Sequence, residues 1–216
     1  MKNKKLYFIH GWGFNSKFWK PLLKILNNEI GDRFETITFD LGFYCNPYYP
    51  SITESQDKKI FFITHSFGYN WLLKNINSFD GLINFCGSAS YFSKKSNIRK
   101  SINRMIKMFK LDPSYVLNDF FKNSGVQFEK PNKLLNNKLL LDSLHLLRDE
   151  NLTTIEFKNK APQQNIFCKD DRIMKIKDLE KLDGDLVVDG DHGFPYKFPR
   201  KASEIILNFL KQNNEL

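Results

Sequence analysis

A serine, Ser66, stands in the segment Thr64-His65-Ser66-Phe67-Gly68, between a buried apolar run and a helical pattern that begins at Tyr69. A serine on such a tight strand-to-helix turn projects its hydroxyl from the carboxyl edge of a sheet, where it can act as a nucleophile. The segment matches the motif G-x-S-x-G at Ser66 and Gly68, whereas Thr64 replaces the first glycine. The pattern therefore predicts Ser66 as the catalytic nucleophile.

A base and an acid that would activate this serine follow two later apolar runs. His192 lies in Asp191-His192-Gly193, on a glycine-flanked loop from which it can reach the serine. Two adjacent aspartates, Asp170 and Asp171, follow the preceding run, and the spacing to the apolar pair at 173–174 favours Asp171 as the residue that orients the imidazole. The alternative role for either aspartate is a helix N-cap. We predict a triad of Ser66, His192 and Asp171.

Acyl transfer also needs two backbone N–H groups that bind the developing oxyanion. The segment His10-Gly11-Trp12-Gly13 directly follows the first strand-like run, and its glycines allow a close approach to the nucleophile. We predict the amides of Trp12 and Phe67 as the oxyanion hole. The alternative is a glycine-rich turn, and for His10 itself we favour a structural, loop-shaping role. Of the other histidines, His65 is expected to turn into the sheet and His145 to lie in a leucine-rich helix.

These residues require a framework of alternating strands and helices. Strand patterns occupy Lys5–Ile9, Phe34–Phe39, Lys59–Thr64, Leu82–Cys86, Gln164–Cys168 and Asp185–Val188. Helical patterns occupy Phe18–Asn27, Tyr69–Asn75, Ile173–Lys181 and Arg200–Asn213. This alternation predicts an α/β fold with a mainly parallel sheet covered by helices on both faces.

One long stretch interrupts the alternation. Residues 93–158 are helical in pattern, with apolar residues at helical spacing and few strand signals. We interpret this stretch as a helical cap inserted before the strand that carries Asp171. The predicted organisation is a core formed by residues 1–92 and 159–216, with the cap at 93–158.

Composition limits the class of protein. The 216 residues are 41% hydrophobic and 15% aromatic, which is enough for one sizeable core. No run approaches the roughly 18 uninterrupted apolar residues of a membrane span. The three cysteines, Cys45, Cys86 and Cys168, are odd in number and lack metal-ligand spacing, so we expect reduced thiols in a cytoplasmic protein. The sequence predicts no metal and no organic cofactor, and we favour a monomer.

With these residues identified, the chain resembles the α/β-hydrolases of biotin synthesis that act as pimeloyl-[acyl-carrier protein] methyl ester carboxylesterases. The resemblance covers most of the chain and rests on the following segments: His10–Asn15 with Phe18-Trp19, the Ser66 turn, Leu111–Phe121 and Leu140–Asp149. It implies the α/β-hydrolase fold, an acyl-enzyme mechanism and an ester substrate on an acyl-carrier protein. Departures from the family pattern are Thr64, Tyr69, Lys175 and a short segment at 40–58.

The distribution of charge suggests a partner surface. The net charge is +9, and seven basic residues with no acidic residue occupy positions 94–110. Acyl-carrier proteins are strongly acidic, so this helix is a candidate dock, and we predict Arg99, Lys100, Arg104 and Lys107 as its partner-binding residues. The alternatives are a solvated helix face and binding to a membrane surface. Nucleic acid is disfavoured because no recognised binding motif accompanies the charge.

Two further functions stay open at this stage. One is a general short-chain carboxylesterase that uses the same triad on free esters. The other is a catalytically idle hydrolase fold that serves as a binding protein.

Overall fold

The computed structural model describes residues 4–52, 59–94, 96–128, 134–155, 157, 160–179 and 184–216. Its strands form one sheet in the order β2-β1-β3-β4-β5-β6, and each pair of neighbours is parallel. The strands are β1 (Lys4–Ile9), β2 (Phe34–Thr38), β3 (Lys59–His65), β4 (Gly81–Phe85), β5 (Gln163–Cys168) and β6 (Leu186–Val188). These bounds confirm the predicted parallel sheet.

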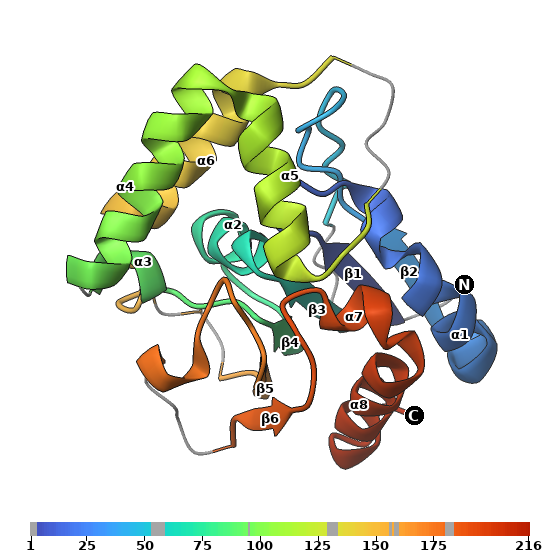
Figure 1. The fold of residues 1–216 in the computed structure, drawn as a ribbon. Helices are drawn as coiled ribbons and strands as arrows, with labels where there is room; N and C mark the ends of the chain where they lie inside the picture. The colour runs from blue at the N-terminus through green and yellow to red at the C-terminus, as the bar shows by residue number, and fades with distance from the viewer. Residues whose placement is uncertain are drawn as a thin grey trace.

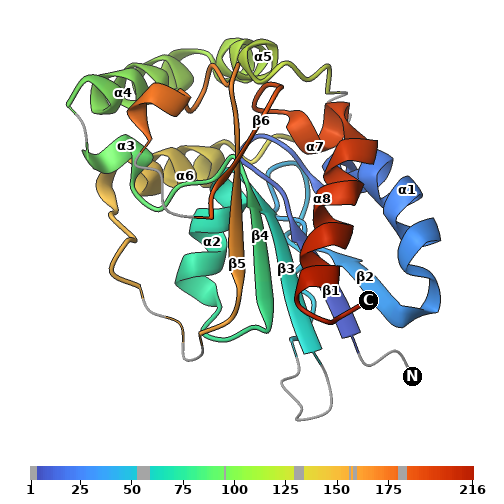
Figure 2. The same cartoon turned by 90° about the horizontal axis from the view of Figure 1, so that it is seen from below.

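Helices cover both faces of this sheet (Figures 1 and 2). One face carries α1 (Lys20–Ile30), α7 (Phe194–Lys197) and α8 (Pro199–Gln212), while the other carries α2 (Phe67–Asn75). Burial on both faces explains why the central strand β3 is a continuous apolar run from Ile60 to Ile63 rather than an alternating one. Short 3-10 helices occur at Ser16–Trp19, Gly31–Arg33 and Ile176–Asp178.

The cap is built from helices between β4 and β5, and it lies over the carboxyl edge of the sheet (Figure 2). Its elements are α3 (Tyr91–Lys94), α4 (Ser96–Leu111), α5 (Pro113–Ser124) and α6 (Asn137–Asp149). Helix α4 buries Ile98, Ile102, Ile106 and Phe109, which repeat at helical spacing. The side chain of Asp112 caps α5 by accepting a hydrogen bond from the amide of Tyr115. The expected helical cap before the acid-bearing strand is thus present.

The helix predicted at Ile173–Lys181 is wrong over the residues that the structure describes. Residues 173–179 contain a single 3-10 turn, Ile176–Asp178, and positions 180 and 181 lie outside the described residues. The side chain of Asp171 accepts the amides of Ile173 and Met174, which holds the chain in a tight turn after β5. Lys175 then adopts an extended conformation (φ −66°, ψ 124°) that no helix continues.

The segment after β2 is short, as its sequence indicates. Residues 40–52 contain no helix, and an isolated antiparallel bridge joins Asp40 and Tyr48. The rest of this segment, 53–58, lies outside the described residues.

Strand order places a crevice beside the predicted nucleophile. Strands β1 and β3 are neighbours, but the chain leaves β1 towards one edge of the sheet, at β2, and leaves β3 towards the other, at β4. Loops that diverge in this way open a crevice at the carboxyl ends of the two strands, where α/β proteins bind ligands. The loop after β1 carries residues 10–13, and the turn after β3 carries Ser66.

Candidate active site

Ser66 occupies a sharp turn between β3 and α2. Its backbone has φ 51° and ψ −122°, a conformation that side chains other than glycine rarely adopt and that costs about 1–3 kcal/mol. The turn is held on both sides, because the Ser66 amide donates to the carbonyl of Phe85 at 2.9 Å and its carbonyl accepts from Tyr69 N at 3.0 Å. These two hydrogen bonds therefore maintain the strained backbone of Ser66. The turn places the Ser66 hydroxyl at the carboxyl edge of the sheet.

A chain of hydrogen bonds joins Ser66 to His192 and Asp171. His192 Nδ1 lies 2.7 Å from Asp171 Oδ2, and His192 Nε2 lies 2.9 Å from Ser66 Oγ. An ionised carboxylate only accepts hydrogen bonds, so Nδ1 carries the proton and Nε2 is left to accept from the serine hydroxyl. This is the arrangement in which a histidine removes the proton of a nucleophilic serine.

The structure distinguishes the two adjacent aspartates. Asp171 is buried, with 4% of its surface exposed, whereas Asp170 is exposed. Asp171 Oδ1 accepts the backbone amides of Ile173 at 2.8 Å and Met174 at 2.7 Å. The carboxylate is thus fixed through one oxygen and free to hold the imidazole with the other. The same side chain also holds the local turn, but no α-helix begins there, so the alternative role of a helix N-cap is not the one found for Asp171.

His65 supports the loop of the candidate base. Its ring is fully buried, stacks on Phe18 with centroids 4.4 Å apart, and places Nε2 2.8 Å from the backbone carbonyl of His192. A carbonyl only accepts, so His65 Nε2 donates this hydrogen bond. Burial, together with the nearby His192, lowers the pKa of His65 well below its ordinary value.

The loop after β1 lies against the nucleophile. A Cβ atom on Gly11 would lie 3.0 Å from Ser66 Cβ and 2.7 Å from His65 Nδ1, so only glycine fits there. Among the described residues, neither the amide of Trp12 nor that of Phe67 has a backbone or side-chain acceptor. The two amides predicted as oxyanion donors are therefore free to bind a ligand oxygen. His10 joins two segments, because its Nδ1 bonds to the carbonyl of Gly11 and its Nε2 accepts from the amide of Leu41 after β2, which fits the structural role favoured for it.

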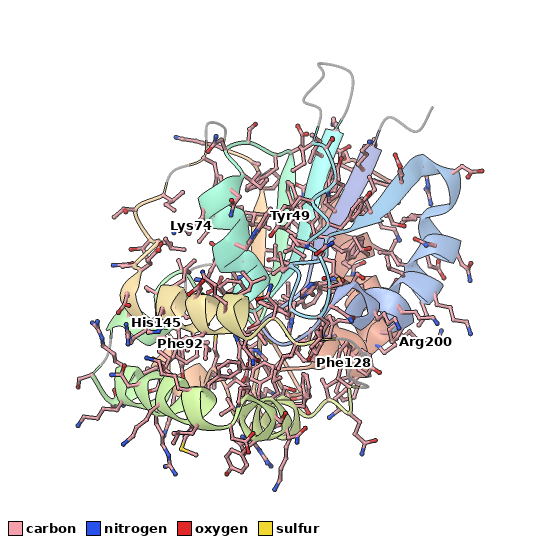
Figure 3. The ribbon with its side chains drawn as sticks, turned by 90° about the horizontal axis from the view of Figure 1, so that it is seen from above. Tyr49, Lys74, Phe92, Phe128, His145 and Arg200 are labelled. Atoms are coloured by element: carbon pink, nitrogen blue, oxygen red, sulfur yellow. The ribbon has the colours of Figure 1, made fainter. Side chains whose placement is uncertain are left out.

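Ser66 opens into a pocket of about 440 Å³ whose walls come largely from the cap. Phe92 of α3, labelled in Figure 3, is one of these wall residues. The other lining residues are Trp12, Ser101, Ile102, Arg104, Met105, Met108, Tyr115, Val116, Asp119, Phe120, Leu144, Leu147, Arg172 and Ile173. The mainly apolar wall suits an acyl or alkyl chain, and the size lies within the range of small-ligand pockets.

The four residues predicted to bind a partner do not share one environment. Arg104 lines the pocket, whereas Arg99, Lys100 and Lys107 lie outside it on the exposed surface of α4. Arg99 pairs with Asp149 of α6 at 3.2 Å, so part of its charge is neutralised within the cap.

Sequence reasoning missed Arg172 and Cys86. Arg172 lines the pocket directly after Asp171, and its contact with the pocket depends on the cap that lies across from it. Cys86 Sγ, Asp171 and His192 bring potential metal-ligand atoms within 4.8 Å of one another, the one such group in the described parts of the chain. A hydrogen bond with Cys168, together with burial, raises the pKa of the Cys86 thiol. Asp171 and His192 are already joined by a hydrogen bond, and His192 also reaches Ser66, so the group fits a thiol packed behind the acid better than a metal centre.

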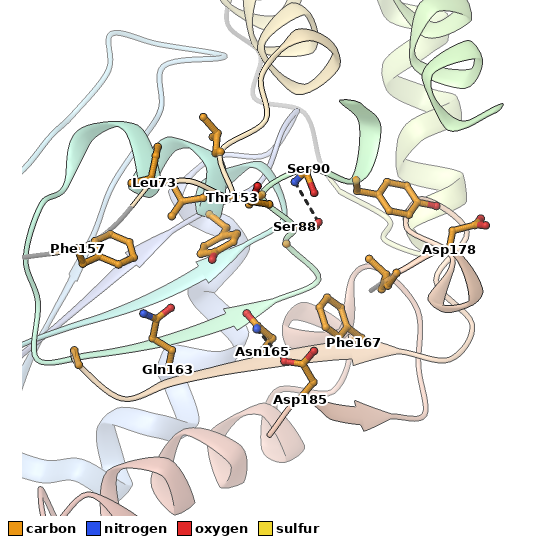
Figure 4. A pocket seen from close by; sticks show the side chains of 18 of the residues that line it. Leu73, Ser88, Ser90, Thr153, Phe157, Gln163, Asn165, Phe167, Asp178 and Asp185 are labelled. Atoms are coloured by element: carbon orange, nitrogen blue, oxygen red, sulfur yellow. Dashed lines mark hydrogen bonds between the residues drawn. The ribbon is translucent and has the colours of Figure 1, made fainter. Parts of the chain in front are cut away.

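A second cavity, of about 770 Å³, lies beside α2 and is not lined by Ser66, Asp171 or His192 (Figure 4). Its wall includes Asn165, whose side chain donates to Asp185 at 2.9 Å and accepts from Asn84 at 3.0 Å. These polar side chains bond to one another across the sheet, and the cavity is separate from the candidate catalytic groups.

Comparisons with known proteins agree on the fold. No model of a protein family matches the sequence, and neither does any curated protein. Among solved structures, an esterase from Exiguobacterium antarcticum aligns at 17% identity over 96% of this chain and 92% of that chain, with a TM-score of 0.74. A bromoperoxidase from Bacillus anthracis aligns at 16% identity over 97% and 92%, with a TM-score of 0.76. MenH from S. aureus aligns at 16% identity over 99% and 96%, with a TM-score of 0.64.

The parallel sheet, its helical layers and these neighbours together define the chain as a protein of the α/β-hydrolase fold. At these identities the likeness concerns the fold alone. In the described residues, no helix has the length and apolar character needed to cross a membrane.

Proposed function

We propose that this chain is a serine-dependent hydrolase of carboxylic esters. The single observation that carries the proposal is the chain of hydrogen bonds from Ser66 Oγ to His192 Nε2 (2.9 Å) and from His192 Nδ1 to Asp171 (2.7 Å). It stands at the carboxyl edge of the sheet beside an apolar pocket, on a strained turn that exposes the nucleophile. A catalytically idle binding protein would have no need of this hydrogen-bonded geometry.

The reaction follows from the positions of these groups. His192 Nε2 takes the hydroxyl proton as Ser66 Oγ attacks the ester carbonyl, and Asp171 stabilises the imidazolium that forms. The amides of Trp12 and Phe67 bind the oxyanion of the tetrahedral intermediate. Its collapse breaks the ester bond, and the leaving alcohol takes the proton from His192. Water, activated by His192, then hydrolyses the acyl-enzyme and restores Ser66.

The finer proposal is that the substrate is a methyl ester of pimeloyl-[acyl-carrier protein], as in biotin synthesis. Three features support it: the resemblance of the cap segments 111–121 and 140–149 to that family, the apolar pocket wall, and the basic face of α4. On this proposal Arg99, Lys100, Arg104 and Lys107 attract the acidic carrier protein. The alternative function is a general short-chain carboxylesterase.

The test measures hydrolysis of pimeloyl-[acyl-carrier protein] methyl ester beside p-nitrophenyl acetate and butyrate, with labelling by a fluorophosphonate. We expect Ser66→Ala to abolish labelling and lower kcat by at least about 10⁴-fold, because the nucleophile is lost. Ser88→Ala is the matched control, since Ser88 lines the second cavity, and it should keep both.

The outcomes separate the alternatives. Cleavage of the carrier-bound ester that weakens with added salt supports the biotin pathway substrate. Activity on the small esters alone keeps the esterase and rejects the carrier-bound substrate. A wild-type chain that neither turns over any ester nor reacts with the fluorophosphonate contradicts the proposed function and favours the idle fold.

A further inference from the structure

Two arginines line the pocket that contains Ser66, and they approach it from different elements. Arg104 belongs to α4 in the cap, and Arg172 belongs to the loop after β5 in the core. In the part of the chain that the structure describes, neither guanidinium forms a hydrogen bond or ion pair with another residue. Arg148 and Arg99, by contrast, are both engaged by Asp149. The pocket therefore presents two cationic groups without a protein counter-ion.

The position of Arg104 on its helix shows that it faces the ligand space. Ser101, Arg104, Met105 and Met108 all line the pocket, and their spacing of three and four residues puts them on one face of α4. Ile106, which is buried and does not line the pocket, lies beside this face. Arg104 thus extends the pocket wall of α4, whereas the other basic residues of this helix do not line the pocket.

Arg172 is placed by the catalytic acid. It is the residue after Asp171, whose carboxylate accepts the amides of Ile173 and Met174 and so fixes the backbone on the far side of Arg172. Arg172 is exposed and lines the pocket, together with its neighbour Ile173. Its side chain therefore extends into the pocket wall from a turn that the Asp171 carboxylate fixes.

One carboxylate, Asp119 of α5, lines the same pocket, but it already accepts a hydrogen bond from Asn123 Nδ2 at 3.0 Å. The formal charge of the pocket lining is positive, with two arginines against one aspartate. The remaining wall is largely apolar, whereas Arg104, Arg172 and Asp119 are exposed to solvent. A neutral fatty ester would leave water as the partner of both guanidinium groups, whereas an anionic group on the substrate could bind them directly.

We propose that the ester substrate carries an anionic group, a carboxylate or a phosphate, on the chain that fills this pocket, and that Arg104 and Arg172 bind it. The inference rests on the proposed ester hydrolysis and names its substrate class. A guanidinium presents N–H donors in a planar fork that matches the oxygens of either anion. Arg104 then acts on the substrate itself, in addition to any attraction of a carrier protein to the surface of α4.

The experiment compares alkyl fluorophosphonates that share one chain and end in a carboxylate, a phosphate or a neutral carboxamide. Rates of Ser66 labelling are measured for the wild type, Arg104→Gln, Arg172→Gln and the double variant. The wild type should react about 10- to 100-fold faster with an anionic probe than with the carboxamide, as expected for charge-assisted hydrogen bonds. The faster of the two anionic probes identifies the anion.

The variants separate recognition from folding. The double variant should react with the anionic probes no faster than with the carboxamide probe, and its thermal unfolding should match that of the wild type. Arg200→Gln is the control, because Arg200 lies on α8, on the far side of the molecule from α4 (Figure 3), and it should retain the full preference.

Two results overturn this inference: equal rates for all probes in the wild type, or a preference that survives in the double variant. The proposed function fails differently, namely when Ser66 reacts with the probes but no carboxylic ester is turned over. A wild-type chain that reacts with none of the probes contradicts the proposed function and this inference together.

Discussion

Ser66 combines a strained backbone conformation with a side-chain hydrogen bond to the candidate base. Its positive φ opposes folding, yet the flanking hydrogen bonds to Phe85 and Tyr69 keep the turn in place. The same conformation directs Oγ to His192, whose other ring nitrogen is held by Asp171. Backbone strain at this position is thus coupled to the hydrogen-bond geometry that a nucleophile requires.

His65 gives a prediction about pH. Its pKa is lowered in the folded chain, by burial first and by the neighbouring His192 and His10 as well, so the unfolded chain binds a proton more readily than the folded one. Stability should therefore fall as the pH drops below about 6.5, the pKa of an unperturbed histidine, by at most about 1.4 kcal/mol per pH unit from this group. His65→Gln removes the titrating ring and keeps an N–H donor for the carbonyl of His192.

The measurement is urea unfolding of the wild type and His65→Gln between pH 4.5 and 7.5. The variant should show a shallower fall of the unfolding free energy toward acid, even though its stability at pH 7.5 is lower. His145→Gln, on the surface of α6, serves as a control and should keep the wild-type slope. Identical slopes for the wild type and His65→Gln would contradict the assignment of this pH dependence to His65.

At the residue scale the sequence located the candidate triad because each member follows a strand end, and spacing preferred Asp171 over Asp170. Arg172 and Cys86 could not be found in the same way. Their significance depends on partners from distant elements: α4 across the pocket for Arg172, and Cys168 on the neighbouring strand for Cys86. Such contacts arise only when the strands are assembled.

At the scale of elements, the packing of α2 on the sheet depends on Gly68. A Cβ atom on Gly68 would lie 2.4 Å from the carbonyl oxygen of Ile9 and 2.8 Å from that of His10, both of which are backbone atoms. Gly68→Ala should push α2 away from β1, disturb the Ser66 turn and cost about 1–3 kcal/mol. We expect this variant to lose most fluorophosphonate labelling, in addition to stability.

Gly31→Ala provides the matched control for this prediction. Gly31 ends α1 at φ 55°, with no atom within 4 Å of an added Cβ, so alanine there carries a backbone cost of about 1–3 kcal/mol without a clash. Both variants should have a lower Tm than the wild type, whereas fluorophosphonate labelling should fall only in Gly68→Ala. A Gly68→Ala chain that labels like the control would show that the close contact is not needed to form the site.

The elements themselves differ in how far the sequence determines them. The strands could be predicted because apolar runs of strand length alternate with helical patterns, and the confirmed fold follows from that alternation. The segment 173–179 was predicted wrongly, because its apolar residues pack into a small cluster with Tyr91, Ile98 and Phe167 rather than along a helix. Local periodicity cannot detect a turn whose amides are bound by the side chain of Asp171, the candidate acid of the triad.

At the scale of the whole molecule, the cap and the core meet at Trp12. Its indole donates to the carbonyl of Leu140 in α6 at 2.9 Å, while its ring packs on Phe109 and Phe120 with centroids 5.9 and 5.0 Å apart. The same residue supplies a candidate oxyanion amide from its backbone. The side chain of Trp12 therefore links the position of the cap to that of the loop after β1, which lies against Ser66.

Trp12→Phe tests this link. The substitution keeps the backbone amide but removes the hydrogen bond to Leu140 and part of the packing, so we expect a loss of about 1–3 kcal/mol in unfolding free energy. Small esters such as p-nitrophenyl acetate need the amide and little of the pocket, and their kcat should change less than about threefold. Esters with longer chains contact the cap wall, and their KM should rise by about tenfold, which corresponds to about 1.4 kcal/mol of binding.

Trp71→Phe is the matched control, because Trp71 lies on α2 against Tyr49, with ring centroids 5.1 Å apart, and does not line the pocket. Both variants lose an indole, so a selective rise of KM for long chains in Trp12→Phe alone would locate the effect at the contact between cap and core. If both substrates lost kcat equally in Trp12→Phe, the side chain would instead be needed to position the oxyanion amide. If neither parameter changed, the cap would be held by its other contacts, and chain-length selectivity would have to come from α4 and α5 without help from the loop at Ser66.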